Sequence, residues 1–258
     1  MNLGLDGKVA IVGGASQGIG FGIARELAAE GATVAMTARR ENDLAAAADR
    51  LRSTGATVLP IQADCRRADD CARVAKTVCD TLGGIDVLVN NDGAPPLGSI
   101  LEFDDAAWSK AVEQNLMYVV RMARECVPSM RARGGGSILN ITAISAIQPI
   151  PGFALSVATW SGVIGYSKTL SLEVAAAGIN VNTICPGYID TTRLQKVFAS
   201  GSEPADVVRE RLLDQIPMKR IGTIEDIAAL VALLVSPRGR YVTGAAIQVD
   251  GGLLRAVR

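Results

Sequence analysis

Histidine is absent from all 258 residues of the sequence. Imidazole is therefore excluded as a general base, as a metal ligand and as a member of a hydrolytic triad, which removes most hydrolase and metalloenzyme mechanisms. Five cysteines are present, but no two of them have the C-x-x-C spacing of a zinc or redox motif. We interpret them as reduced thiols.

Net charge and long apolar runs are also lacking. Lys and Arg number 26, as do Asp and Glu, so no excess of one sign indicates nucleic acid or a membrane surface as a partner. No stretch is long and apolar enough to span a bilayer, and the start MNLGLDGKVAIVGG lacks the features of a secretion signal. We expect a cytoplasmic protein that binds neither nucleic acid nor membranes.

What the sequence does contain is a regular alternation of short apolar stretches with longer, alanine-rich stretches of helical pattern. KVAIVGG precedes GFGIARELAAEG, and TVAMTA precedes ENDLAAAADRLRSTG. Short strands separated by helices of about ten or more residues are typical of a parallel sheet that is buried on both faces. The pattern predicts an α/β fold, a single doubly wound domain over residues 1–258.

A more polar stretch late in the chain, TTRLQKVFASGSEPADVVRERLLDQIPMKR, interrupts this alternation. Sheets of this kind often carry a mobile segment over the cleft at this point. We predict a flap at about 188–217, with a turn at Gly201-Ser202-Glu203-Pro204 inside it.

Three glycines, Gly14, Gly18 and Gly20, lie between the first predicted strand and the first predicted helix. Glycines allow a tight turn and a close backbone approach, and the helix then offers N–H groups and a positive dipole end to a pyrophosphate. The strand, turn and helix context favours a dinucleotide site over the alternative of a plain structural turn.

The glycine spacing resembles the T-G-x-x-x-G-x-G loop of the short-chain dehydrogenase/reductase (SDR) family. Other motifs follow in the family's order, namely NNDG at 90–93, Asn115, NIT at 140–142, PGYIDT at 186–191 and VTGAAIQVDGG near the end. The resemblance extends over nearly the whole chain. It implies a Rossmann-like fold and an oxidoreductase that uses a nicotinamide dinucleotide.

By this resemblance, the dinucleotide site would be lined by Gly14, Gly18, Gly20, Asp64, Asn90 and Thr191. Arg39 stands after the second strand, where NAD-specific members have an acidic residue, so any retained cofactor should be NADP(H). The alternative is that Arg39 and Arg40 form a solvated helix start. Gly13 replaces the family's threonine, and Asp92 replaces the alanine of N-N-A-G, where its carboxylate would repel the anionic cofactor.

The resemblance also places the family's catalytic serine, tyrosine and lysine. Without a gap in the alignment these positions hold Ala143, Ser156 and Trp160, so all three have lost their function, while Asn115 is retained. A serine hydroxyl without a neighbouring base is a poor proton donor or acceptor. We therefore predict no catalytic residue at these positions.

Tyr166-Ser167-Lys168 offers an apparent replacement pair on the same predicted helix. At about 100° per residue, positions two apart face roughly opposite directions. The family's pair requires a four-residue step, and none of Tyr118, Tyr166, Tyr188 and Tyr241 has a lysine four residues later. We predict that Tyr166 is not catalytic.

These losses predict a catalytically silent homologue that acts as a structural or regulatory subunit. Family members resemble one another in forming tetramers through the long helices expected at 105–131 and 156–177. Such a chain would form a heterotetramer with an active SDR paralogue, or a homotetramer. By analogy alone, the complex would be a heteromeric NAD(P)-dependent alcohol or hydroxyacyl dehydrogenase, as in toluene and benzylsuccinate catabolism.

Two alternatives stay open. The first is an active NADP(H)-dependent oxidoreductase with an unusual proton donor. That donor would have to supply the roughly 10²- to 10⁴-fold rate increase that general acid-base catalysis typically gives. The second is a non-catalytic nucleotide-binding sensor. The substrate cannot be read from the sequence, although Ile147, Ile150, Phe153 and Phe198 hint at an apolar group.

Overall fold

The computed structural model describes residues 2–91, 93, 95–199 and 204–256, and its frame is one sheet of seven parallel strands. The strand order is β3-β2-β1-β4-β5-β6-β7, and every pairing is parallel. The strands are β1 (Val9–Val12), β2 (Thr33–Ala38), β3 (Val58–Gln62), β4 (Val87–Asn90), β5 (Gly136–Ile141), β6 (Ile179–Pro186) and β7 (Ala246–Val249). This topology confirms the predicted Rossmann-like doubly wound fold.

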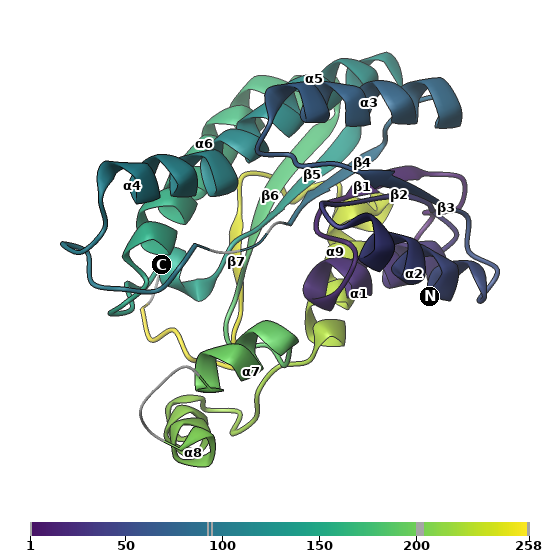
Figure 1. Cartoon of the computed structure of the whole chain (residues 1–258). Helices are drawn as coiled ribbons and strands as arrows, with labels where there is room; N and C mark the ends of the chain where they lie inside the picture. The colour runs from purple at the N-terminus through teal and green to yellow at the C-terminus, as the bar shows by residue number, and fades with distance from the viewer. Residues whose placement is uncertain (1, 92, 94, 200–203, 257–258) are drawn as a thin grey trace.

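Helices cover both faces of the sheet (Figure 1). One face carries α1 (Gly18–Ala29), α2 (Glu41–Arg52) and α9 (Ile224–Val235), and the other carries α3 (Ala68–Leu82), α5 (Tyr118–Ala132) and α6 (Ala154–Val174). The helix expected at 105–131 is divided into α4 (Asp105–Val112), one wide π-helical turn (Glu113–Met117) and α5. No helix in the described part of the chain is long and apolar enough to cross a bilayer.

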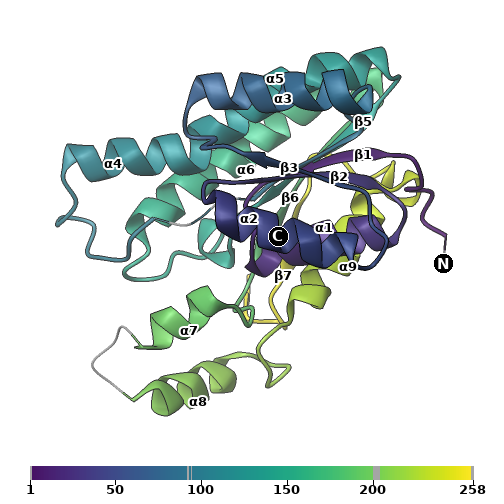
Figure 2. The ribbon, with the colours of Figure 1, turned by 45° about the vertical axis from the view of Figure 1, so that its right-hand side comes forward.

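The predicted flap region is mostly helical. It contains α7 (Thr192–Ala199) and α8 (Ala205–Gln215), which lie apart from the two helical layers (Figure 2). Residues 201–203 of the predicted turn lie outside the described residues, so the turn and the mobility of the flap stay predictions. Short 3₁₀ turns occur at Ile144–Ala146, Ala175–Ala177 and Pro237–Gly239.

Two buried clusters, one on each face, form the core. Every residue of β1 and β4 is buried, because both strands lie in the middle of the sheet under helices on both sides. Alternate residues of one strand therefore enter opposite clusters, as Ala10 and Ile11 do. This two-sided burial explains the continuous apolar runs that predicted the strands.

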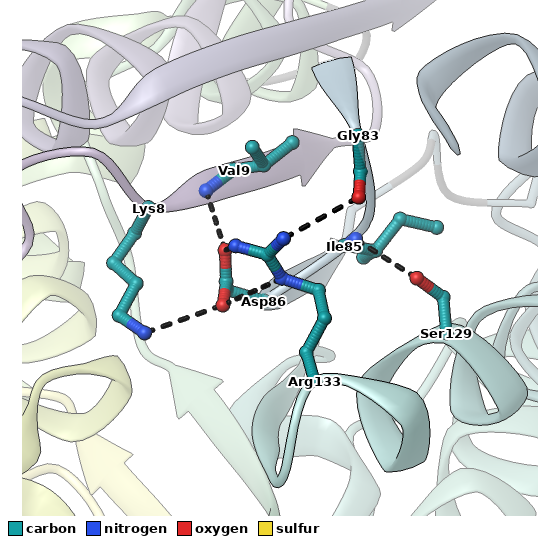
Figure 3. Close-up of polar contacts among 7 residues, drawn as sticks. All are labelled: Lys8, Val9, Gly83, Ile85, Asp86, Ser129 and Arg133. Atoms are coloured by element: carbon teal, nitrogen blue, oxygen red, sulfur yellow. Dashed lines mark hydrogen bonds and ion pairs between the residues drawn. The ribbon is translucent and has the colours of Figure 1, made fainter. Parts of the chain in front are cut away.

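Asp86, just before β4, connects the amino ends of β4 and β1 through hydrogen bonds. Its carboxylate accepts hydrogen bonds from Val9 N (2.9 Å), Lys8 Nζ (3.3 Å) and Arg133 Nε and Nη2 (3.1 and 2.8 Å), as Figure 3 shows. Burial by itself would raise the pKa of Asp86, but these donors and cations outweigh it and hold the pKa below its usual range. This network lies at the edge of the sheet opposite to the carboxyl ends of the strands.

Replacing Asp86 by asparagine is expected to lower the free energy of unfolding by about 2 kcal/mol, because hydrogen bonds to a buried charge are lost. Since the folded-state pKa is depressed, the stabilisation is present above the unfolded-state pKa and disappears as the pH falls through the folded-state pKa. Urea unfolding of wild type and Asp86→Asn at several pH values measures the difference. Asp80→Asn, which breaks the exposed pair with Lys76, is the control and should change little; equal losses in both variants would contradict the prediction.

Candidate functional site

A cleft of about 680 Å³ opens at the carboxyl ends of the strands. Its walls come from the loops that follow β1, β2, β5 and β6, with shorter contributions after β3 and β4. The sheet order reverses between β1 and β4, and in doubly wound sheets ligands bind beside such a reversal. The cleft therefore lies where this fold places a dinucleotide.

The glycine loop forms one end of the cleft. Gly14 has φ of +58°, and a Cβ on it would lie 2.5 Å from the carbonyl oxygen of Asn91. A Cβ on Gly20 would lie 2.4 Å from the carbonyl oxygen of Gly14, whereas one on Gly18 would meet only Thr191 Cγ2, at 3.9 Å. Gln17 at the N-cap of α1 makes no side-chain cap, so the first N–H groups of the helix are available to an anion. These features fit a pyrophosphate.

The predicted cofactor residues divide into two groups. Gly14, Gly18, Arg39 and Thr191 line the cleft. Gly20, Asp64 and Asn90 are not among the described residues that line it. Gly20 packs under the loop, and Asn90 Nδ2 donates to Asn140 Oδ1 at 2.8 Å. Their roles as cofactor-binding residues stay predictions.

The side chain of Asp64 is bound by Arg66, two residues later in the chain. Its carboxylate accepts from Arg66 Nε at 2.7 Å and from Arg66 Nη2, and the side-chain hydrogen bond with Arg66 lowers the pKa of Asp64. The adjacent residues Ala63 and Cys65 line the cleft in its place. Ala63 and Cys65 are therefore the residues of this segment that face the cleft.

Arg39 lies directly after β2, in the part of the cleft that contains the glycine loop. It is exposed and lines the cleft, and no ion pair of Arg39 is found among the described residues. Arg40 differs, since its Nε pairs with the carboxylate of Asp43. The Arg39 guanidinium, unlike that of Arg40, is therefore available to bind a phosphate at this end of the cleft.

The opposite end of the cleft contains two of the three positions that we predicted to correspond to the family's catalytic groups. Ala143 and Trp160 line the cleft, with Trp160 half-buried. Ser156 is buried and is not one of the described lining residues, and its hydroxyl has no hydrogen-bond partner in the described part of the structure. These three positions do not form a proton-transfer group.

Asn115 lies in the π-helical turn behind Trp160. Its Nδ2 donates to Thr159 Oγ1 at 2.9 Å, and that hydroxyl donates to the carbonyl of Leu155 at 2.7 Å. Asn115 Oδ1 has no partner among the described residues and borders a cavity of about 10 Å³ beside Tyr118 and Trp160. A space of this size holds one water at most.

Tyr166 and Lys168 face different sides of α6, as the helical spacing predicts. The Tyr166 ring packs on the cluster of α3 and α5, while Lys168 Nζ lies against Gly244, 2.9 Å from where a Cβ would stand. Neither is among the described lining residues of the cleft. Ser167, between them, accepts from Asn140 Nδ2 at 2.8 Å in the core.

Sequence reasoning did not select several residues that line this end of the cleft, above all Ser145, Tyr188 and Arg193. Tyr188 stands in the PGYIDT motif, which was the available signal for it. Burial lowers the pKa of Arg193, whose Nη2 lies 3.5 Å from the carbonyl oxygen of Pro95. Asp92, expected to weaken cofactor binding, lies outside the described residues.

Comparison with known proteins identifies the family. The model of the Enoyl-(Acyl carrier protein) reductase family matches residues 14–254. Dehydrogenase/reductase SDR family member 4 of Homo sapiens is 33% identical over 249 residues, which are 96% of this chain and 88% of the relative. The chain belongs to the SDR family.

Further SDR relatives match along their whole length. The 3-oxoacyl-[acyl-carrier-protein] reductase FabG of Staphylococcus epidermidis is 36% identical over 247 residues, covering 95% of this chain and 98% of the relative. The crystal structure of L-sorbose reductase from Gluconobacter frateurii, complexed with NADPH and L-sorbose, superposes with a TM-score of 0.95 at 36% identity, with 100% of both chains covered. The SDR fold is therefore shared with these proteins.

Proposed function

We propose that this SDR member is an NADP(H)-dependent oxidoreductase that reduces a carbonyl compound in the cleft. The observation that carries the proposal is Arg39, an available cation at the end of β2 in a cleft whose glycine loop fits a pyrophosphate. The crystal structure of the similar L-sorbose reductase, solved with NADPH, and that of YwfH, described as an NADPH-dependent reductase, support NADPH as the cofactor.

The predicted role as a catalytically silent subunit of a heteromeric dehydrogenase is wrong. The FabG proteins and L-sorbose reductase, which match nearly the whole chain, are named as reductases, which favours the alternative of an active oxidoreductase. That prediction rested on the inference that three catalytic groups are lost, and this inference concerns where the proton comes from rather than whether a cofactor binds. Association into a homotetramer and a cytoplasmic location stay predictions.

NADP(H) would be held by Gly14, Gly18, the first N–H groups of α1, Arg39 and Thr191. When bound, it supplies a hydride to the carbonyl carbon. The Arg39 guanidinium would pair with the 2′-phosphate, and the walls at Trp160 and Phe153 would keep water from the reacting end.

We further propose that Ala143, Ser156 and Trp160 stand in place of the family's serine, tyrosine and lysine. Alanine and tryptophan have no group that exchanges a proton at a carbonyl, and the buried Ser156 lies behind the wall. In the family the lysine lowers the pKa of the catalytic tyrosine, and here Trp160 would stand in place of that lysine. The reaction therefore requires a proton donor from another part of the cleft.

Cofactor preference provides the first test. Arg39→Ala is expected to weaken NADPH binding about 10- to 100-fold and to leave NADH binding nearly unchanged, because one charged hydrogen-bond partner of the 2′-phosphate is removed. Fluorescence titration with both nucleotides gives the two dissociation constants. Arg40→Ala is the control with a smaller expected effect, since Arg40 already pairs with Asp43. Tighter binding of NADH than of NADPH by the wild type would contradict the assignment.

Turnover provides the second test. Purified wild type is mixed with NADPH and a panel of ketones that includes L-sorbose and a 3-oxoacyl thioester, and NADPH absorbance is followed. Oxidation of NADPH with formation of the alcohol supports the proposal. Tight NADPH binding without turnover of any ketone would favour the nucleotide-binding sensor instead.

A further inference from the structure

The reacting end of the cleft contains few hydroxyl groups that are not already used in the protein. Thr142 Oγ1 donates to the carbonyl of Ile184 at 3.1 Å and lies 3.3 Å from Cys185 Sγ. Thr159 Oγ1 donates to Leu155, away from the cleft lining. Tyr188 and Ser145 both line the cleft, and neither side chain makes a hydrogen bond within the described part of the structure.

Tyr188 is a phenol fixed in position at the cleft. Its backbone carbonyl accepts from Gly222 N at 2.9 Å, and its ring packs on an apolar cluster that includes Leu212 and Ile216 of the α8 region and Leu253. The side chain is half-buried. Its hydroxyl is not among the fully buried polar atoms that lack a hydrogen-bond partner. The ring is therefore held from behind by apolar side chains, while the residue forms part of the cleft wall.

Ser145 is the second hydroxyl at this end. It lies in the 3₁₀ turn Ile144–Ala146, its side chain is only 1% exposed, and its Oγ has no partner among the described residues. A buried hydroxyl without a partner is costly in a native protein, and because Ser145 lines the cleft, a molecule bound there can supply the partner. Ile144, next to Ser145, packs in the same cluster as the Tyr188 ring, which brings the two hydroxyl-bearing residues to one region of the cleft.

We propose that Tyr188 donates the proton and Ser145 holds the carbonyl oxygen during reduction, an inference that rests on the proposed function. As the carbonyl carbon accepts the hydride, the electron pair of its π bond moves to the oxygen. That oxygen takes the proton of the Tyr188 hydroxyl and becomes the alcohol, while Ser145 donates a hydrogen bond to it. The hydride comes from NADPH and the phenolate regains a proton from solvent, so each cycle converts NADPH, the ketone and one proton into NADP⁺ and the alcohol.

Tyr118 is the competing phenol, because it also lines the cleft. It comes from the start of α5, is 4% exposed and borders the small cavity of Asn115. A fully buried phenol exchanges its proton with water less readily than the half-buried Tyr188. Replacing each tyrosine in turn therefore distinguishes Tyr188 from Tyr118 as the proton donor.

The test compares Tyr188→Phe, Ser145→Ala, Tyr118→Phe and the control Tyr166→Phe, which removes a hydroxyl remote from the cleft. Tyr188→Phe is expected to lower kcat for ketone reduction by about 10² to 10⁴. Ser145→Ala is expected to lower kcat by about 10² and to weaken the binding of the ketone to the NADPH complex. Tyr166→Phe should match the wild type.

Two binding measurements accompany the kinetics. NADPH dissociation constants, followed by fluorescence, should be the same in all four variants as in the wild type, and quenching of bound NADPH should show that Tyr188→Phe still binds the ketone. Unchanged kcat in Tyr188→Phe, or a larger loss in Tyr118→Phe, would overturn the assignment while the proposed function stands. A wild type that reduces no ketone would instead overturn the proposed function and this inference with it.

Discussion

Gly20→Ala is expected to lower the free energy of unfolding by about 3 kcal/mol and the melting temperature by roughly 6 to 12 °C. The added Cβ would lie 2.4 Å from the carbonyl oxygen of Gly14, and 2.7 Å from both the carbonyl oxygen of Gly13 and Asn91 Nδ2. Two of these atoms belong to the backbone of the loop, so no side-chain rotation relieves the contact. The loop itself must move, and NADPH binding should be lost with it.

Gly18→Ala is the matched control in the same loop. Its φ of +58° costs an alanine about 1 kcal/mol, but its Cβ would meet only Thr191 Cγ2, at 3.9 Å. We expect a nearly normal melting temperature with weakened NADPH binding, because the methyl group enters the cleft. Thermal unfolding and NADPH titration of the two variants separate the effects. Equal melting temperatures for Gly20→Ala and the wild type would contradict the packing that the structure describes.

Alcohol oxidation is expected to be at least about 100-fold slower than carbonyl reduction near pH 7, and its rate should rise about tenfold per pH unit. Oxidation needs the phenolate of Tyr188 as a base, whereas reduction needs the protonated phenol. Burial raises the pKa of Tyr188, and an ordinary phenol with a pKa of about 10 is already less than roughly one part in a thousand ionised at pH 7. Reduction should therefore change little up to about pH 9.

The groups around Tyr188 support this direction. The side chains that pack on its ring are apolar, which disfavours the charged phenolate, and the charged residues described in the cleft lining are Arg39, Arg40 and Arg193. Initial rates in both directions from pH 6 to pH 10 measure the profiles, and Tyr188→Phe should remove the slope in oxidation. An oxidation rate that is flat from pH 7 to pH 9 in the wild type would show that a group of lower pKa acts as the base.

The fold could be predicted from the sequence because its signals are local. β1 and β4 are apolar throughout since they are buried on both faces, and Gly14 and Gly18 have positive φ angles that belong to the local turn between β1 and α1. The opposite orientation of Tyr166 and Lys168 likewise follows from helical geometry alone. Such features depend on neighbours within a few residues, so periodicity and spacing determine them.

The candidate site depended on contacts between distant parts of the chain. Spacing could not show that Asp64 turns to Arg66 while Ala63 and Cys65 reach the cleft. Nor could it show that Tyr188 joins the apolar cluster of Ile144, because the two are brought together by the parallel pairing of β5 with β6. The sequence by itself determined the doubly wound sheet and the glycine loop. Only the tertiary structure decided which hydroxyls line the cleft, since that depends on how the ends of separate strands pack.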